Sequence, residues 1–518
     1  MPEPTTTDAC ERYDMVVVGG GVNGAGIARD AAGRGLSVLL CERNDLAAHT
    51  SGASSKLIHG GLRYLEHFEF SLVAKALAER EVLLRSAPHI IWPMRFVMPH
   101  VASLRPAWMI RLGLLLYDHL DLGKRKLLAG SRGLKLREHV AGVALKPEFE
   151  RGFEYSDGWV EDSRLVVLNA MDAREHGARI LTRTPCSSAS RGADGWTLTL
   201  ASAGGDELQV RARALVNATG PWVSEFLLRS VGHSRARRIR QVKGSHIVVK
   251  RLCDHRYGYI LQNEDRRVVF ALPYEHLYTL IGTTDVEYEG EPADAHISNE
   301  EMDYLCAAVN RYFVKQTGPQ DVVYRYSGVR PLLDDEDRDA ATVTRDYLLE
   351  LDTEGAPLLS VFGGKITTFR RLAEEAVDRL GPLIGNHAGA WTAGPPLPGG
   401  DIAGAQFDDF LARLKKSRPW LPDALATRLA RGYGTRVDRL LGDAGALAEL
   451  GEPFGDDLYE AEVRYLVEHE WARTAEDVLW RRSKLGLHVA PATVAALERW
   501  MAANGAEPTL AATMSRTN

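Results

Sequence analysis

The chain has 518 residues, of which 45% are hydrophobic and 25% charged, and its formal net charge is −6 at neutral pH. These values are typical of a soluble globular protein of about three domains and give no electrostatic reason to expect a nucleic-acid partner. The five cysteines are scattered and form no Cys-x-x-Cys pair. This pattern argues against a disulfide framework, a zinc site or an iron–sulfur site and favours a reducing compartment. The first fourteen residues contain Glu3, Asp8 and Glu11 and no apolar core, so they resemble neither a secretory signal nor a transit peptide.

A glycine-rich turn near the N-terminus is the most informative local feature. The apolar run 14–18 leads into Gly19-x-Gly21-x-x-Gly24, and a second apolar run ends at Glu42. The dinucleotide-binding fingerprint has the same order: a strand, Gly-x-Gly-x-x-Gly, a helix, a second strand and an acid. Gly19 permits the tight turn, Gly21 lets the backbone approach a pyrophosphate, and Gly24 lets helix and strand pack closely. We expect the helix N-terminus to bind the phosphates and Glu42 to accept hydrogen bonds from a ribose diol. The alternative is a glycine-rich turn with a structural role only.

The next segment, residues 50–64, is rich in small and hydroxylated side chains and also carries polar groups that could contact a ligand. A helix is expected to follow it and to stop before Pro88. The longest apolar stretch is residues 108–117, which is interrupted by Arg111 and is too short to span a bilayer. With basic residues near both ends, it is either an amphipathic helix on a membrane surface or a buried helix or dimer contact; composition alone favours the second.

The remaining elements are predicted from alternation and turn signals. Residues 180–212 are typical of a β-meander, and the strand after it ends in small residues, Ala218-Thr219-Gly220, where backbone can approach a cofactor. Residues 241–290 alternate as in an antiparallel sheet that could cover a substrate. Near residue 360 a strand, a Gly-Gly turn and a helix beginning at Lys365 are expected. Residues 394–400 are rich in Pro and Gly and mark a boundary, beyond which the chain is mostly helical.

Several segments together resemble one known family, the FAD-dependent glycerol-3-phosphate dehydrogenases. They stand in the family's order and spacing, and they are residues 54–66, 244–246, 282–285, 326–331 and 362–368. The C-terminal region also resembles the family's extra domain, including residues 473–477, where Thr474 and Asp477 form a capping-box pattern. Without calcium-loop motifs, this region is similar to the bacterial respiratory form.

The resemblance implies an α/β fold with a Rossmann-like FAD-binding domain of the glutathione-reductase/D-amino-acid-oxidase type. An antiparallel-sheet substrate domain is inserted into it, and an all-α domain follows. The expected division is FAD-binding parts at 1–90, 156–235 and 336–392, substrate parts at 91–155 and 236–335, a linker at 393–400 and a helical domain at 401–518.

The implied reaction is oxidation of sn-glycerol 3-phosphate to dihydroxyacetone phosphate. FAD takes the hydride from C2 and passes the electrons to membrane quinone. The family resemblance further implies a peripheral protein on the cytoplasmic face of the inner membrane, often a homodimer. It therefore favours the membrane-surface interpretation of residues 101–126, with Leu104, Trp108, Leu112 and Leu115 on the apolar face and Lys124, Arg125 and Lys126 nearby.

The resemblance also implies a set of residues around FAD. The expected cofactor contacts are Gly19, Gly21, Asn23, Gly24, Glu42, Arg43, Ser51, Ser54, Ser55, Lys56, Leu57, His59, Ala218, Thr219, Gly220, Gly364, Lys365, Ile366 and Thr367. Thr367 could instead cap the helix predicted to follow it.

Bidentate donors are expected for the substrate phosphate, and Arg330 and Arg63 are the candidates. Their alternative is an ion pair with a carboxylate such as Asp334 or Asp335. Lys365 could stabilise the charge of the reduced flavin or contact the substrate.

Tyr64 and Thr284 are further candidates for substrate binding. The proton acceptor is His246 or His59, and we favour His246. In the alternative, Arg330 or Lys365 polarises the hydroxyl and water takes the proton.

Three other functions compete with this interpretation. An amine or amino-acid oxidase of the same fold would prefer an arginine and an aromatic cage for a carboxylate, whereas this chain offers an additional Arg and Lys that suit a phosphate. An oxygen-dependent glycerol-3-phosphate oxidase is hard to separate by sequence. A flavin-bearing assembly subunit would have no need of Arg63, His246, Arg330 and Lys365.

Overall fold

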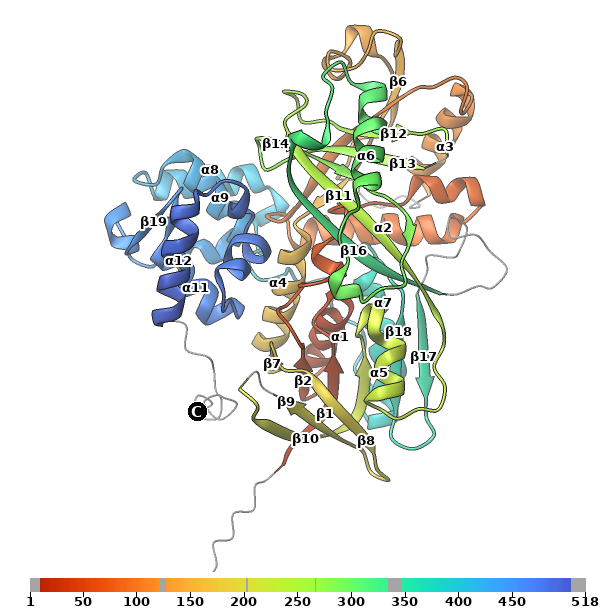
Figure 1. Ribbon diagram of the computed structural model, residues 1–518. Coiled ribbons are helices and arrows are strands. Elements are labelled where there is room, and N and C mark those ends of the chain that lie inside the picture. Colours follow the sequence, from red (N-terminus) through yellow and green to blue (C-terminus); the bar gives the residue numbers. More distant parts are fainter. Residues whose placement is uncertain (1–9, 121–126, 202–203, 266, 334–346, 505–518) are drawn as a thin grey trace, which may run out of the picture.

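The computed structural model describes residues 10–120, 127–201, 204–265, 267–333 and 347–504. Two large sheets lie one above the other in Figure 1, and a helical domain drawn in blue lies beside them. The chain passes between the two sheets several times, so each is built from segments far apart in the sequence. This arrangement agrees with the predicted insertion of one sheet domain into the other.

The lower sheet contains the predicted dinucleotide-binding unit. Its strand order is β17-β18-β10-β1-β2-β7, in which β18, β10, β1, β2 and β7 pair in parallel and β17 pairs antiparallel to β18. The strands are β1 Glu11–Val18, β2 Val38–Cys41, β7 Arg179–Leu181, β10 Glu207–Asn217, β17 Leu348–Asp352 and β18 Leu358–Phe362. Strands buried on both faces explain the continuous apolar runs at β1 and β2.

Helices cover the lower sheet on its two faces. On one face lies the largest apolar core, shared with α1 Val22–Gly33, α4 Asp162–Glu175 and α7 Phe369–Leu380. The other core includes α5 Val223–Arg229 and the strands β8 Cys186–Arg191 and β9 Trp196–Ala201. Strands β8, β9 and β10 pair antiparallel in sequence order, which confirms the predicted meander.

The upper sheet is predominantly antiparallel, as its alternating sequence predicts. Its order is β15-β11-β14-β13-β12-β4-β6-β3, with β16 beside β11 and β5 beside β6. The strands are β3 Leu57–Ile58, β4 Ile91–Pro99, β5 Arg132–Lys135, β6 Arg151–Val160, β11 Ile239–Lys250, β12 Gly258–Gln262, β13 Val268–Tyr274, β14 Tyr278–Gly282, β15 Val286–Glu287 and β16 Val322–Leu333. One face packs on α6 Asn299–Tyr312, and the other packs on α2 Phe70–Ser86 and α3 Ala107–His119. Helix α2 ends before Pro88, as predicted.

One predicted helix start is wrong. The helix after β18 begins at Phe369, so Lys365 lies in the preceding turn rather than in the first helical residues. Gly363 and Gly364 have φ angles of +75° and +99°, which belong to left-handed backbone. The chain therefore makes a longer turn than a direct strand-to-helix passage requires.

The third body is the helical domain, with α8 Phe407–Ser417, α9 Asp423–Tyr433, α10 Val437–Leu441, α11 Glu460–Glu470 and α12 Pro491–Asn504 around their own apolar core. A short hairpin of β19 Pro453–Gly455 and β20 Leu458–Tyr459 interrupts the helices of this region, which the sequence predicts as mostly helical. The Pro/Gly segment at 394–400 does not run freely through solvent: Leu397 is buried and its N–H donates to Ser86 O at 2.8 Å. The domain is thus attached closely to α2.

Candidate active site

The glycine-rich turn has the geometry that the fingerprint predicts. Gly19 has a φ of +113°, and a Cβ added to it would collide with the carbonyl of Ala218. A Cβ at Gly24 would collide with the carbonyl of Gly19. Strand β1, helix α1 and the end of β10 therefore approach one another more closely than any residue with a side chain would allow. Ala218 and Thr219 lie beside the glycine turn, and the predicted contacts of Ala218, Thr219 and Gly220 with the cofactor stay predictions.

The N-terminus of α1 is surrounded by the predicted polar residues. The Val22 N–H donates to Ser51 Oγ at 3.0 Å. Asn23 Nδ2 donates to Gly363 O at 3.2 Å, and its Oδ1 is buried with no hydrogen-bond partner among the described residues. A Cβ at Gly364 would lie 2.8 Å from Asn23 Nδ2, so the turn before Lys365 lies against the start of α1. The N-terminus of a helix suits a phosphate, and the amide oxygen of Asn23 can accept a hydrogen bond from a hydroxyl or N–H group of the same cofactor.

The acid at the end of β2 is held by backbone. Glu42 Oε2 accepts from Gly20 N–H at 2.6 Å and Oε1 accepts from Asn44 N–H at 2.8 Å, while burial raises its pKa. Arg43 follows it, with its guanidinium 3.8 Å from the ring centroid of Trp222. These contacts fix the carboxylate beside the glycine turn. The described residues therefore fit an FAD, whose ribose diol would lie at Glu42 and whose pyrophosphate would lie at α1.

His246 is the most enclosed of the predicted catalytic residues. Its Nε2 lies 2.9 Å from Ser55 Oγ, and its ring stacks on Tyr326 with 4.8 Å between centroids. Nδ1 is buried and has no hydrogen-bond partner among the described residues. Burial, with the charges of Lys56 and Arg330, lowers the pKa of His246 to about 3. The imidazole is therefore neutral near pH 7 and can accept a proton.

The loop that contains Ser55 is anchored from below by a buried ion pair. Lys56 Nζ lies 2.7 Å from Asp162 Oδ1, and Ser54 Oγ donates to Asp162 Oδ2 at 2.8 Å. Tyr326 in turn donates from its hydroxyl to Ser54 O at 2.9 Å. The side chains of Ser54 and Lys56 are thus engaged with Asp162, and Leu57 is buried in β3. Their predicted contacts with the cofactor stay predictions.

Arg330 is oriented by two protein groups. It lies 2.7 Å from Asp285 Oδ1 and donates to Thr284 O at 2.9 Å, with its side chain 28% exposed. The alternative carboxylates named from the sequence, Asp334 and Asp335, lie outside the described residues. The Thr284 hydroxyl is buried, donates to Glu301 Oε1 at 2.7 Å and accepts from Ser245 N–H at 2.9 Å. Thr284 therefore supports Arg330 through its carbonyl, and a contact of its hydroxyl with substrate stays a prediction.

Lys365 and Tyr64 lie together. The Lys365 ammonium is 4.1 Å from the ring centroid of Tyr64. Thr367 is buried, and its hydroxyl accepts from the His59 N–H at 3.3 Å, which joins this turn to the residue 50–64 loop. The hydroxyl of Thr367 is not the cap of α7, which begins after Thr368.

Two of the predicted residues complete this region. Ile366 packs on the core of the lower sheet. Arg63 lies in the 3-10 helix Leu62–His67, and its side chain is outside the described part of the structure.

Several supporting residues were missed by sequence reasoning. Tyr326 and Asp285 both stand in segments that carry the family resemblance, so the motifs contained a signal for them. Asp162 and Glu301 have no such signal, because each becomes important only through a partner more than 15 positions away. The structure places all four next to predicted residues.

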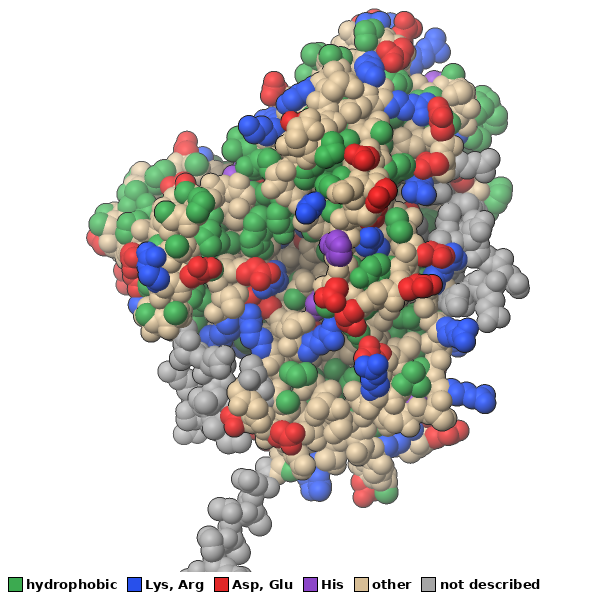
Figure 2. All heavy atoms as spheres, in the orientation of Figure 1, with side chains coloured by type: hydrophobic (Ala, Val, Ile, Leu, Met, Phe, Trp, Pro, Cys, Tyr) green, Lys and Arg blue, Asp and Glu red, His purple; other side chains and the backbone are tan. Residues whose placement is uncertain are grey.

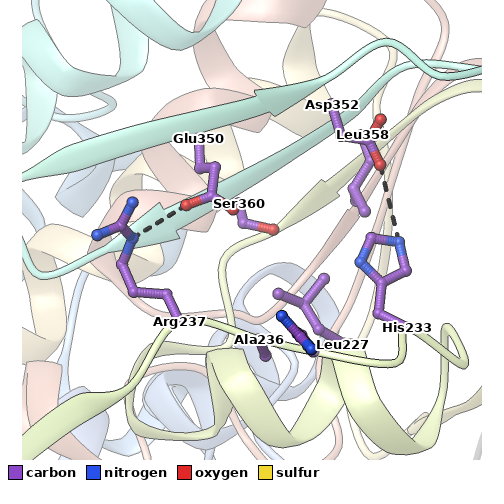
Figure 3. Close-up of a pocket in the computed structure, with 9 residues that line it drawn as sticks. Leu227, His233, Ala236, Arg237, Glu350, Asp352, Leu358 and Ser360 are labelled. Carbon is purple, nitrogen blue, oxygen red and sulfur yellow. Dashed lines mark hydrogen bonds and ion pairs between the residues drawn. The ribbon is translucent and has the colours of Figure 1, made fainter.

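A separate cavity of about 360 Å³ lies on the outer face of the lower sheet, away from these residues (Figure 3). Its charged groups are largely paired with one another: Arg237 with Glu350 at 3.0 Å and His233 with Asp352 at 3.8 Å. Paired charges of this kind indicate a surface ion-pair group, and the cavity is not part of the candidate active site.

The fold and the glycine cradle define an FAD-dependent oxidoreductase. The family model "FAD dependent oxidoreductase" matches residues 14–370, and "C-terminal domain of alpha-glycerophosphate oxidase" matches residues 390–509. The chain is 55% identical to a glycerol-3-phosphate dehydrogenase of Pseudomonas aeruginosa over 95% of each chain. It is 52% identical to a D-erythritol 1-phosphate dehydrogenase of Brucella abortus, over 95% of this chain and 98% of the relative.

Among solved structures, the glycerol-3-phosphate dehydrogenase of Bacillus halodurans complexed with FAD superposes with a TM-score of 0.77 at 27% identity. The match covers 95% of this chain and 90% of that one. The chain belongs to the family of FAD-dependent glycerol-3-phosphate dehydrogenases. This confirms the resemblance, the fold class and the cofactor predicted from the sequence.

Proposed function

We propose that this enzyme oxidises sn-glycerol 3-phosphate to dihydroxyacetone phosphate and that its electrons pass to membrane quinone. The observation that carries the proposal is the convergence of a neutral histidine, His246, and an oriented arginine, Arg330, beside a dinucleotide cradle. Relatives that align over 95% of this chain and are named glycerol-3-phosphate dehydrogenases support the substrate class.

Different residues serve the two requirements of the reaction, substrate binding and proton transfer. Arg330, oriented by Thr284 O and Asp285, binds the substrate phosphate through its guanidinium. FAD, when bound, supplies the acceptor for the C2 hydride. His246 accepts the hydroxyl proton at Nδ1, because Ser55 already contacts Nε2. The phosphate also offsets the Arg330 charge that lowers the pKa of His246, which makes this residue a better base in the complex.

Lys365 and His59 have supporting roles in this proposal. Lys365, beside the start of α1, stabilises negative charge that develops on the flavin side of the site. His59 lies on the same loop as Ser55 and is the alternative proton acceptor. A His246→Ala variant that keeps the wild-type rate of flavin reduction would assign the role to His59 or to water.

The first experiment is an anaerobic absorbance titration of the yellow protein. We expect sn-glycerol 3-phosphate to bleach the flavin band, and glycerol and amino acids to leave it unchanged. D-erythritol 1-phosphate should be tested in the same series, because the chain is 52% identical to a D-erythritol 1-phosphate dehydrogenase. Bleaching by the four-carbon compound alone would reassign the substrate, and bleaching by amino acids would contradict the phosphate requirement. Re-oxidation by oxygen as fast as by a quinone analogue would indicate an oxidase.

We also propose peripheral binding to the cytoplasmic face of the inner membrane through α3. Trp108, Met109, Leu112, Leu115 and Leu116 are between 39% and 69% exposed, while Ile110, Leu114 and Tyr117 on the same helix are buried. Figure 2 shows hydrophobic side chains gathered over this helix. Among the described residues, no helix is long and apolar enough to cross a membrane. Leu104 is half-buried, and the basic residues Lys124, Arg125 and Lys126 lie outside the described residues.

The assembly and the domain limits belong to the same proposal. A homodimer and the domain division given above are supported by the family assignment. Light scattering of the detergent-purified enzyme tests the dimer.

A further inference from the structure

One short helix of the C-terminal domain contacts two segments that lead into the candidate active site, strand β16 and the loop after Glu42. Residues Asp477–Arg482 form a π-helix, which we call the brace helix. Thr474 and Asp477 cap it reciprocally: Asp477 N–H donates to Thr474 Oγ1 at 3.2 Å, and Thr474 N–H donates to Asp477 Oδ2 at 2.9 Å. The predicted capping box is therefore present, although the helix that it begins is wider than an α-helix. Such π turns occur frequently at functional sites.

Trp480, on the brace helix, packs on the substrate sheet. Its ring stacks on Tyr324 of β16 with 4.0 Å between centroids and 12° between planes. A Cβ added to Gly486 would collide with the indole, so the absence of a side chain there leaves the space that the ring fills. Both rings are half-buried at the contact between the two domains.

Strand β16 connects the residue that Trp480 contacts with the residue that contacts the proposed base. Tyr324 and Tyr326 are two residues apart on one strand and therefore lie on the same face, with 6.3 Å between their rings. Tyr326 stacks on His246 and is also its cross-strand neighbour. The rings of Trp480, Tyr324, Tyr326 and His246 thus form a continuous row from the C-terminal domain to the active site.

The next two residues of the brace helix, Arg481 and Arg482, bind the loop that follows Glu42. Arg481 Nε and Arg482 Nη2 donate to the Asp45 carboxylate at 2.6 and 2.8 Å. Asp45 directly follows Asn44, whose N–H holds Glu42. Asp45 is fully buried, so this pairing is shielded from solvent and salt. One helix therefore fixes the strand of the substrate site relative to the loop of the cofactor site.

We infer that the C-terminal domain sets the catalytic geometry, with Trp480 as a positioning residue that acts on His246 through Tyr324 and Tyr326. This inference rests on the role proposed above for His246. Proton transfer requires a defined distance between base and substrate, and a displacement of about 1 Å can cost up to about 100-fold in rate. Loss of the indole leaves Tyr324 free to move toward the vacated space, and Tyr326 and His246 follow it.

The test compares variants of the full-length holoenzyme by anaerobic stopped-flow reduction with sn-glycerol 3-phosphate. We expect Trp480→Leu to slow the maximal rate of flavin reduction roughly tenfold, with less than about a twofold change in the substrate concentration for half-maximal rate. The pH profile of this rate should also shift, because the environment of His246 changes. Trp480→Phe, which keeps an aromatic ring, should restore most of the rate.

Trp500→Leu is the matched control. Trp500 belongs to the same domain, and its ring contacts, with Phe454 and Arg464, lie within that domain. We expect this variant to lower the melting temperature without slowing reduction. Equal slowing by Trp480→Leu and Trp500→Leu, or a wild-type rate in Trp480→Leu, would overturn the inference. Failure of the proposed substrate would instead be seen in the wild-type enzyme, which would then not be reduced by sn-glycerol 3-phosphate.

Discussion

At the scale of single residues, two glycines leave the space that the side chains of the proposed site occupy. A Cβ at Gly282 would collide with the His246 ring, so this glycine gives the imidazole its place beside Ser55. Gly244 has the same relation to Arg330, whose Nη2 lies 2.5 Å from the Cβ that an alanine would carry. Both glycines stand in segments that resemble the family, and each makes room for a side chain of the proposed site.

The first prediction concerns Arg330. We expect Arg330→Ala to raise the KM for sn-glycerol 3-phosphate at least about tenfold, because charge-assisted hydrogen bonds contribute about 1.5–3 kcal/mol. FAD content should not change, since Arg330 contacts none of the residues of the glycine cradle among its described partners. Arg238→Ala, which removes an exposed charge in the loop before β11, is the control. An unchanged KM in Arg330→Ala would remove this residue from the substrate site.

At the scale of elements, α3 has two apolar faces with different roles. Its buried face packs on the substrate sheet, and its exposed face is covered by nothing among the described residues. The sequence alone could not separate a membrane-surface helix from a buried one, because both have the same composition. The structure shows that one face of α3 is buried and the other is exposed, and the exposed face is the one proposed to bind the membrane.

The element-scale prediction tests that exposed face. Trp108→Glu combined with Leu112→Glu should release the enzyme from anionic liposomes, because two charges oppose insertion of the helix at the interface. Co-sedimentation measures the effect. The control replaces two exposed leucines on the lower domain, Leu228 and Leu383, with glutamate and should leave binding intact. Undiminished co-sedimentation of the α3 variant would contradict the proposed docking surface.

At the scale of the whole molecule, buried neutral histidines contribute to the pH dependence of stability in acid. Burial lowers the pKa of His89, as of His246, to about 3, and both nitrogens of His89 lack hydrogen-bond partners among the described residues. The unfolded chain binds protons at these residues below about pH 6.5, whereas the folded chain does not until about pH 3. The contribution of these two histidines to the free energy of unfolding is therefore fully present above pH 6.5 and falls as the pH decreases toward 3.

The corresponding prediction is a change in the slope of unfolding free energy against pH. Each such histidine contributes up to about 1.4 kcal/mol per pH unit within this window. His89→Phe should therefore flatten the decline in unfolding free energy between pH 6 and 4, as measured by urea denaturation. Burial raises the pKa of Asp30 to about 6, so Asp30 opposes the decline in unfolding free energy as the pH falls. This effect is the same in the wild type and in His89→Phe, so the difference between them reports on His89. The same slope in His89→Phe as in the wild type would contradict this account, and the exposed His387→Gln serves as the control.

The amino-acid sequence by itself determined the elements whose signals are local. The glycine turn with its acid at Glu42, the meander before β10 and the capping box at Thr474 each depend on a short stretch of chain, so periodicity and turn chemistry are enough to predict them. The motifs also identified Arg330 and His246 as site candidates. The start of α7 was misplaced, because Gly363 and Gly364 extend the turn before Lys365.

The tertiary structure alone decided how these residues act. The Asp285 partner of Arg330, the low pKa of His246 and the contact of Trp480 with Tyr324 all depend on segments brought together from distant parts of the chain. Burial and charge at a site are sums over such neighbours, and no local pattern contains them. The chemistry of the residues was therefore readable in the sequence, whereas their protonation, orientation and support were set by packing.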